Sequence, residues 1–270
     1  MPLLQLSVIA IVQGFTEFLP ISSSGHLVLI PIFTDWPDQG QTIDVAAHVG
    51  TLFAVMAYLY RDVWAMLLSV FMLMKGRVTP GLRLIGFLII GTIPVMVAGY
   101  AMNLYFPDGI RGLEVIGWTT LGFGIVLLAA DRIGLTLRRI DHLKISDVVM
   151  IGFAQCLALV PGTSRSGICM TAGRLLGMER AESARFSMLL SMPAILGAGL
   201  LKGWGVYKAG EISITGDLAI VAGLSFVAAL VVIILFMAWL RRANFTPFAI
   251  YRVILGAGLL SLAYGGTSYF

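Results

Sequence analysis

Charged side chains are scarce in this 270-residue sequence: they make up 12% of it, whereas hydrophobic residues make up 59% and the mean hydropathy is +0.94. Soluble domains are about half apolar and about one quarter charged. The scarcity of charge therefore excludes an ordinary soluble domain and predicts an integral membrane protein. The net charge is only +4, and no basic run is interleaved with aromatic residues, so no nucleic-acid partner is expected.

Cysteine is also scarce. Cys156 and Cys169 lie 13 residues apart in or beside apolar segments, without a C-x-x-C motif, so both are expected to be plain membrane-embedded thiols that report no redox compartment. The first 20 residues lack a basic start, and Glu17 interrupts their apolar run. They are therefore expected to be mature structure rather than a cleaved signal.

Long apolar segments are abundant, and about 20 apolar residues are enough to cross a membrane. The segment 45–74 contains Arg61 and Asp62, so it is expected to be tilted or broken. We predict an all-α polytopic membrane protein with six crossings, at about 45–74, 84–102, 113–131, 186–202, 218–240 and 247–266.

Two further segments, 3–33 and 147–178, each contain an apolar run, a proline with a polar Ser/Gly cluster, and a second apolar run. Each half is short for a separate crossing, and its polar middle needs protein or water around it. This pattern predicts two re-entrant helix–loop–helix hairpins.

The two hairpins resemble each other, because Ser-Ser-Ser-Gly at 22–25 matches Ser-Arg-Ser-Gly at 164–167 except at the second residue. One hairpin plus three crossings per half gives an odd number of crossings, so the second half must be inverted. We therefore predict a single membrane domain, 1–270, with repeat 1 at about 1–131 and repeat 2 at about 145–270. Inverted repeats with broken helices place a site at the repeat interface.

Basic residues support this topology. The loops and helix ends at 75–83, 132–144, 174–185 and 241–242 carry twelve of the eighteen Lys and Arg residues, whereas Arg111, Lys202 and Lys208 are the three on the opposite side. The positive-inside rule makes the first side cytoplasmic, so the termini and first hairpin face outward. Arg174, Arg180 and Arg185 are expected at this cytoplasmic edge, without chemistry.

Ionisable residues at membrane depth indicate function by default. Three of them need an explanation, namely Glu17, His26 and Arg165, while His48 looks ordinary. The guanidinium of Arg165 suits a phosphate or carboxylate, and Ser164 and Ser166 flank it.

The glycines Gly162 and Gly167 allow tight turns around this arginine, so backbone N–H groups can also face an anion. In the first hairpin, Ser22, Ser23 and Ser24 stand just before His26. Their spacing brings a hydroxyl nucleophile and an imidazole base within reach of each other.

Gln13 and Glu17 are four residues apart and therefore lie on the same face of a helix. Their oxygens suit a hard cation that keeps waters and bridges phosphate oxygens. Taken singly, a serine-rich break or a lone membrane carboxylate is more often structural. The occurrence of a carboxylate, a hydroxyl, an imidazole and an arginine in these two polar breaks favours a functional site.

The stretches QGFTEFLPISSSGH and AQCLALVPGTSRSG resemble the (Glu/Gln)-x-x-x-Glu and PGxSRSxxT elements of the bacitracin-resistance type of undecaprenyl-diphosphate phosphatase. Further stretches, FSMLLSMPA at 186–194 and FTPFAIYRVILG at 245–256, are similar to that family. The family's threonine position is occupied here by Cys169, with Thr171 two residues later, which puts the role of that threonine in doubt.

The resemblance implies removal of the terminal phosphate from undecaprenyl diphosphate, which recycles the carrier lipid for peptidoglycan synthesis and confers bacitracin resistance. It also implies a divalent cation (Mg²⁺ or Ca²⁺) and a multi-pass protein of the bacterial inner membrane whose site opens to the outer side. The expected partners are the polyprenyl diphosphate and membrane lipids, and a homodimer is left open.

Carried over by position, the resemblance implies catalytic roles for Glu17, Ser23, His26 and Arg165, with either Ser23 or His26 as the attacking group. Gln13 and Glu17 would serve the metal. Substrate-binding roles fall to Ser22, Gly162, Thr163, Ser164 and Ser166. The alternative is an inverted-repeat transporter or lipid-phosphate translocator, which needs the arginine but has little need for a hydroxyl beside an imidazole. A purely structural membrane protein ranks third.

Overall fold

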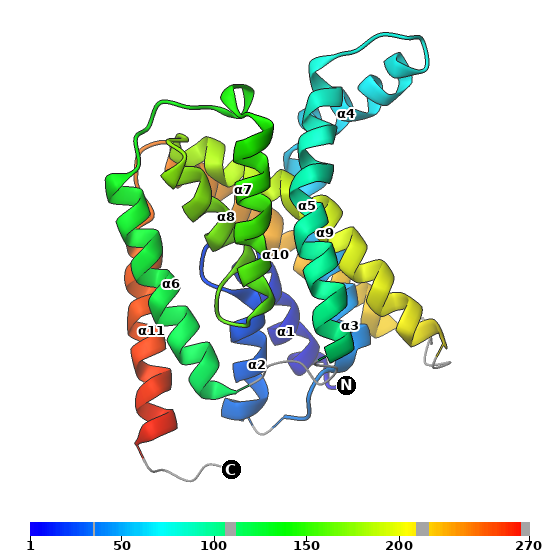
Figure 1. Ribbon diagram of the computed structural model, residues 1–270. Helices are drawn as coiled ribbons and strands as arrows, with labels where there is room; N and C mark the ends of the chain where they lie inside the picture. The colour runs from blue at the N-terminus through cyan, green and yellow to red at the C-terminus, as the bar shows by residue number, and fades with distance from the viewer. Residues whose placement is uncertain (35, 106–111, 209–215, 266–270) are drawn as a thin grey trace.

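The structure is a computed structural model that describes residues 1–34, 36–105, 112–208 and 216–265, with only the backbone at 202 and 204–208. Within these ranges the protein is helical and contains no strand (Figure 1). Two 3₁₀ turns lie at Ile140–His142 and Leu157–Leu159. The α-helices are α1 (Leu3–Thr16), α2 (Ser23–Thr34), α3 (Gly40–Tyr58), α4 (Tyr60–Leu73), α5 (Pro80–Tyr105), α6 (Leu113–Ile133), α7 (Ile145–Cys156), α8 (Arg165–Leu175), α9 (Arg180–Lys208), α10 (Gly216–Leu240) and α11 (Thr246–Tyr264).

Five helices are long and apolar enough to cross a membrane: α5, α6, α9, α10 and α11. A sixth crossing results if α3 and α4 count together, although α4 is turned by 85° from α3. The prediction of an all-helical, multi-pass membrane protein is therefore confirmed. The expected break in segment 45–74 falls at Leu59, between α3 and α4.

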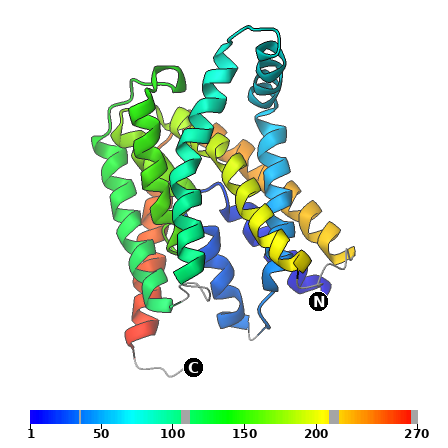
Figure 2. The same ribbon diagram turned by 45° about the vertical axis from the view of Figure 1, so that its right-hand side comes forward.

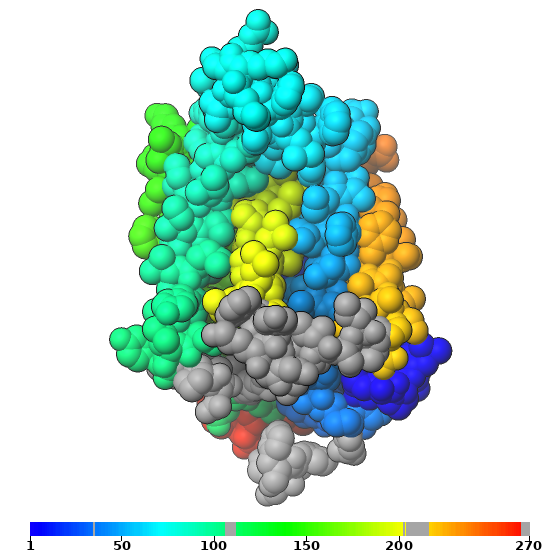
Figure 3. Space-filling view, turned by 90° about the vertical axis from the view of Figure 1, so that its right-hand side faces the viewer, coloured from blue at the N-terminus to red at the C-terminus, as the bar shows by residue number. Residues whose placement is uncertain are grey.

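Helix α4 projects beyond the rest of the bundle and has only Ser69 buried (Figure 1). The space-filling view shows it at one end of the molecule, above α3, α5 and α9 (Figure 3). Asp62 in its first turn pairs with Arg185 of α9, which also bonds Glu182 at 3.3 Å. This ion pair holds the start of α4 against α9, at the bend between α3 and α4.

The remaining helices pack closely where small residues meet. Helices α1 and α3 lie along α10, α7 lies along α5, and α6 lies along α11. A Cβ atom on Gly50 of α3 would come within 2.1 Å of the Ala222 carbonyl oxygen of α10. Such contacts are typical of membrane helices, which approach through glycine because no hydrophobic force drives apolar helices together in lipid.

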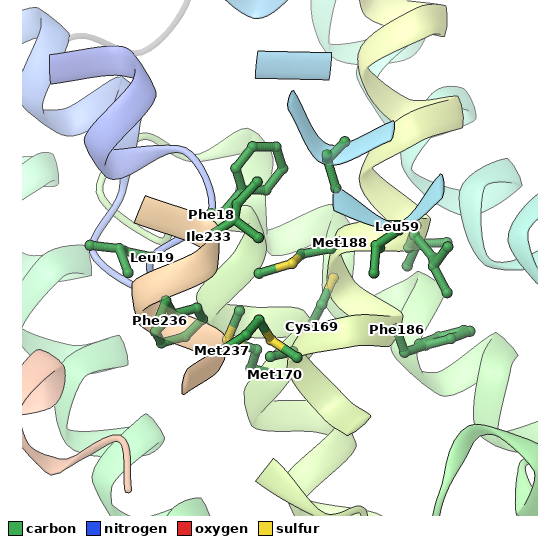
Figure 4. Close-up of a cluster of buried hydrophobic side chains, with 14 of the residues drawn as sticks. Phe18, Leu19, Leu59, Cys169, Met170, Phe186, Met188, Ile233, Phe236 and Met237 are labelled. Carbon is green, nitrogen blue, oxygen red and sulfur yellow. The ribbon is translucent and has the colours of Figure 1, made fainter. Parts of the chain in front are cut away.

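Helices α1 and α2 form one hairpin, and α7 and α8 form another. The first hairpin has its open end on the side where both termini lie, the second has its open end on the opposite side, and their loops approach each other inside the bundle (Figures 1 and 2). Phe18 and Leu19 anchor the first loop in the main hydrophobic cluster, beside Ile233 and Phe236 of α10 (Figure 4). The apolar pair within QGFTEFLPISSSGH thus holds the polar residues in place.

The end of the bundle opposite the termini, which carries Arg174, Arg180 and Arg185, contains a buried ionic cluster. Arg174 is fully buried and donates to Asp131 at 3.1 Å, and Arg180 donates to the same carboxylate oxygen at 2.7 Å. Arg174 also donates to the backbone carbonyls of Leu135 and Gly134. Arg174 is buried at this end because the loop after α6 folds back over it.

The predicted charge asymmetry can be followed only in part. Arg111 lies outside the described residues, and so do the side chains of Lys202 and Lys208. The assignment of this end to the cytoplasm remains a prediction.

Candidate active site

Each hairpin loop ends in a serine with left-handed backbone: φ is 74° at Ser22 and 70° at Ser164. Among the described residues no other residue except glycine has a positive φ. In both turns the serine hydroxyl accepts the backbone N–H three residues later, from Gly25 at 3.3 Å and from Gly167 at 3.1 Å. This cap begins the following helix and satisfies one of its free N–H groups. The local geometry of the two turns therefore matches as closely as their sequences do.

Glu17 joins the two loops. Its side chain is almost fully buried, and its Oε1 accepts a hydrogen bond of 2.8 Å from Nη2 of Arg165, which is 148 residues away in the sequence. The other oxygen, Oε2, accepts from Ser23 Oγ at 2.7 Å and from Gln13 Nε2 at 2.9 Å. The structure thus brings three predicted site residues together around the carboxylate of a fourth, Glu17.

His26 lies apart from this carboxylate. Its Nδ1 is 2.7 Å from the Ser22 carbonyl oxygen, and its Nε2 is 2.6 Å from the Tyr251 hydroxyl of α11. Both ring nitrogens therefore have partners other than a serine hydroxyl, and the hydroxyl of Ser23 is directed to Glu17. Ser23 and His26 thus lie in one turn as predicted. In the described part of the chain, however, no hydrogen bond joins their side chains.

The phosphate-binding residues predicted around Arg165 are mostly engaged in holding the loops. Ser166 Oγ donates to the Leu19 carbonyl of the first loop at 2.7 Å, and lies 3.1 Å from Ser164 Oγ. Gly162 has φ of 89°, and a Cβ there would lie 2.2 Å from Thr119 Oγ1 of α6. Only glycine fits this position, because it needs both a left-handed backbone and close contact with α6.

Arg252 of α11 is a residue that the sequence interpretation missed. It is fully buried and donates to carbonyls of both loops: Pro20 at 3.2 Å, Gly162 at 2.9 Å and Thr163 at 2.8 Å. Within the described residues it has no carboxylate partner. An arginine inside a predicted crossing was itself the signal, since ionisable residues at membrane depth are rarely without a role.

His48 of α3 was predicted to be ordinary, but its Nε2 lies 3.8 Å from Glu17 Oε2. Its side chain is one-third exposed, whereas that of Glu17 is 5% exposed. In the sequence His48 lies on a separate predicted crossing, and no local pattern indicates that it lies near Glu17. Arg165 and His48 thus both lie beside the buried carboxylate of Glu17.

Two buried side-chain oxygens in the described part of the chain lack a hydrogen-bond partner, namely Gln13 Oε1 and Thr163 Oγ1. Buried polar groups are almost always paired, so an unpaired one often marks a place for an ion, water or ligand. Both belong to residues predicted for the site.

These side chains could supply only part of the coordination shell of a hard cation. In the described residues no group of three or more His, Cys, Asp or Glu side chains could hold a metal ion. Gln13 Oε1 is free, however, and Glu17 supplies a carboxylate beside it. One carboxylate with one amide oxygen is compatible with Mg²⁺, which is usually bound through one or two carboxylates plus substrate phosphates and keeps several waters.

Sequence comparison agrees with the motifs in both loops. The family described as "Bacitracin resistance protein BacA" matches residues 6–258. The chain is 50% identical to "Undecaprenyl-diphosphatase 1" of Rhodospirillum rubrum, over 98% of this chain and 97% of the relative. It is 49% identical to "Undecaprenyl-diphosphatase" of Dinoroseobacter shibae, over 98% of this chain and all of the relative. With the match covering both loops and reaching into α11, the chain belongs to the bacitracin resistance protein BacA family.

Proposed function

We propose that this protein hydrolyses undecaprenyl diphosphate to undecaprenyl phosphate and inorganic phosphate. The names of its relatives support this activity. The observation that carries it in the structure is Glu17, which bonds Ser23 of one loop and Arg165 of the other. A nucleophile and an anion-binding group are thereby held at one point between the hairpins.

In this proposal Arg165 binds the terminal phosphate through its guanidinium and neutralises the charge that develops on the phosphate oxygens. Positioning and charge stabilisation supply most of the catalysis in phosphoryl transfer. Arg252 stands behind both loops and adds a second positive charge, while its hydrogen bonds hold the loop carbonyls away from the phosphate.

Two attacking groups are compatible with the geometry. In one route Ser23 Oγ bonds to the terminal phosphorus, its proton passes to Glu17, and the bond to the bridging oxygen breaks to release undecaprenyl phosphate. In the other, Nε2 of His26 attacks after parting from Tyr251. Water then hydrolyses the phosphoserine or phosphohistidine.

A divalent cation, Mg²⁺ or Ca²⁺, is proposed to be held by Gln13 and Glu17. When bound, it would neutralise and orient the diphosphate oxygens. The free Oε1 of buried Gln13 supports this role. Glu17 would then share its carboxylate between the cation and its protein partners.

The two hairpins are proposed to be re-entrant and the two halves to form an inverted repeat. In support, α1 packs along α10 while α7 packs along α5, which is the exchange of partners expected when α1 corresponds to α7 and α5 to α10. We further propose an inner-membrane location with the site open to the outer side, the prenyl chain among membrane lipids. A homodimer is not needed for this site, since one chain supplies every group named.

The alternative of a transporter or lipid-phosphate translocator is not favoured by the comparisons. The hydrogen bond from Ser23 to Glu17 also argues against it, since binding alone does not require a hydroxyl beside a buried carboxylate.

The test is phosphate release from a prenyl diphosphate by purified protein in detergent, with Mg²⁺, Ca²⁺ or a chelator. Wild type is compared with Ser23→Ala, His26→Ala and Arg165→Ala. The control is Ser7→Ala, at a partly exposed serine of α1 whose hydroxyl bonds the Leu3 carbonyl of the same helix. We expect cation-dependent release that Arg165→Ala abolishes and Ser7→Ala leaves unchanged. No release from folded protein that still binds the lipid would contradict the proposal and favour the translocator.

A further inference from the structure

The histidine of the first hairpin has an unusual partner. The Ser22 carbonyl oxygen can only accept a hydrogen bond, so Nδ1 of His26, at 2.7 Å, must carry a proton. In the neutral ring the lone pair is then on Nε2. The Tyr251 hydroxyl lies 2.6 Å from that atom and donates to it. The reactive nitrogen of His26 is therefore occupied by a phenol.

The position of Tyr251 is determined by its neighbour in the sequence. Arg252 is bonded to the carbonyls of both loops, so α11 is fixed against them at this residue. Tyr251 consequently stands beside His26, with ring centroids 5.8 Å apart and an angle of 10° between the rings. The tyrosine is 42% exposed and the histidine is partly exposed, so the pair lies at the accessible edge of the site.

A phenol can serve both charge states of an imidazole. It donates to Nε2 when the ring is neutral and accepts from Nε2–H when the ring is protonated. A carbonyl or an ammonium group could serve only one of these states. The stacked ring and the hydroxyl together can hold His26 in one orientation while a proton arrives and leaves.

We propose that Tyr251 is a positioning residue of the active site, which holds the His26 ring in one orientation through the hydrogen bond to Nε2 until that nitrogen parts from the hydroxyl to meet the substrate. The inference rests on the proposed phosphatase function. It concerns the route in which His26 attacks, because that route uses the Nε2 lone pair.

The test compares Tyr251→Phe, which keeps the stacked ring and removes the hydroxyl, with Tyr264→Phe. Tyr264 is also an exposed tyrosine of α11, and its hydroxyl bonds Trp118 at 3.4 Å, far along the helix from His26. We expect Tyr251→Phe to lower kcat about tenfold or more, the scale on which groups that orient a histidine act, with little change in KM. Tyr264→Phe should retain wild-type values.

The second measurement does not depend on activity. The chain has three histidines, so ¹⁵N-histidine NMR can isolate His26 after assignment with His48→Gln and His142→Gln variants. Nε2 of His26 should show the shift of a hydrogen-bonded acceptor in wild type and lose it in Tyr251→Phe. An unchanged Nε2 signal, or a kcat in Tyr251→Phe within twofold of wild type, would overturn the inference. If wild type releases no phosphate, the proposed function fails, and the NMR result alone decides whether Tyr251 orients His26.

Discussion

The two hairpin loops share one backbone design and differ in the chemistry that they carry. Both place a serine in the left-handed region, cap the next helix with its hydroxyl, and continue through two residues to glycine. The residue after the capping serine is Ser23 in the first loop and Arg165 in the second, and both meet at Glu17.

This difference indicates how a repeated turn can form an asymmetric site. A left-handed serine costs about 1–3 kcal/mol in backbone strain, and such strain is often found at functional sites. Here it directs the next side chain of each loop toward the carboxylate of Glu17. The two turns share one backbone geometry, and the residue after the capping serine divides the site into a hydroxyl side and a cationic side.

The largest effect is expected from Arg165→Ala, which removes the cationic side and leaves buried Glu17 without its ion-pair partner. Loss of one such group in an enzyme typically lowers turnover by about 10²–10³-fold, so kcat/KM should fall by at least this factor. Arg165→Lys should recover only part, because an ammonium group cannot reproduce the guanidinium fork. Steady-state phosphate release measures both, with exposed Arg139→Ala as control. Full activity in Arg165→Ala would refute the division between the loops.

The next effect concerns the residue that binds both loops together. Arg252→Met should keep much of the side-chain volume but leave the carbonyls of Pro20, Gly162 and Thr163 unpaired. Each buried group left unpaired costs about 1–3 kcal/mol, so a loss of about 3 kcal/mol or more in the free energy of unfolding is expected. Thermal unfolding in detergent would measure it. A melting temperature equal to that of wild type would show that the loops hold together without this arginine.

A smaller and equal effect is expected from Ser22→Ala and Ser164→Ala. Each removes a helix cap worth about 1 kcal/mol while leaving the left-handed backbone unchanged. The glycine variants at the same positions should be less destabilised, because glycine adopts this conformation without strain. Melting temperatures of the four variants test the equivalence. Clearly unequal losses between the two alanine variants would break the comparison of the loops.

The smallest effect is expected from Cys169→Thr, which restores the threonine of the family motif. Cys169 is buried, with its Sγ 3.8 Å from Gln155 Oε1. A threonine hydroxyl at this position could make a shorter hydrogen bond, since a thiol is a weak donor. Activity should stay within about twofold and stability should change by less than about 1 kcal/mol. A large loss of phosphate release would instead give the thiol a specific role.

Much of the site could be predicted because its residues occur in two short polar interruptions of apolar sequence. Glu17, Ser23 and Arg165 were identified in this way, and the structure brings them together. His48 and Arg252 were missed for different reasons. Arg252 meets the same criterion of charge at membrane depth, whereas the proximity of His48 to Glu17 depends on how α3 packs against the first loop.

The sequence by itself determined the membrane class, the helical hairpins and the residue types of the candidate site. Apolar length and the cost of unpaired polar groups in lipid leave few alternatives to helices with protected breaks. Only the tertiary structure decided which partner each group takes. Ser23 bonds Glu17 and not His26, His26 bonds Tyr251, and Arg252 binds both loops. These pairings depend on packing between helices far apart in the sequence, and local spacing carries no information about such contacts.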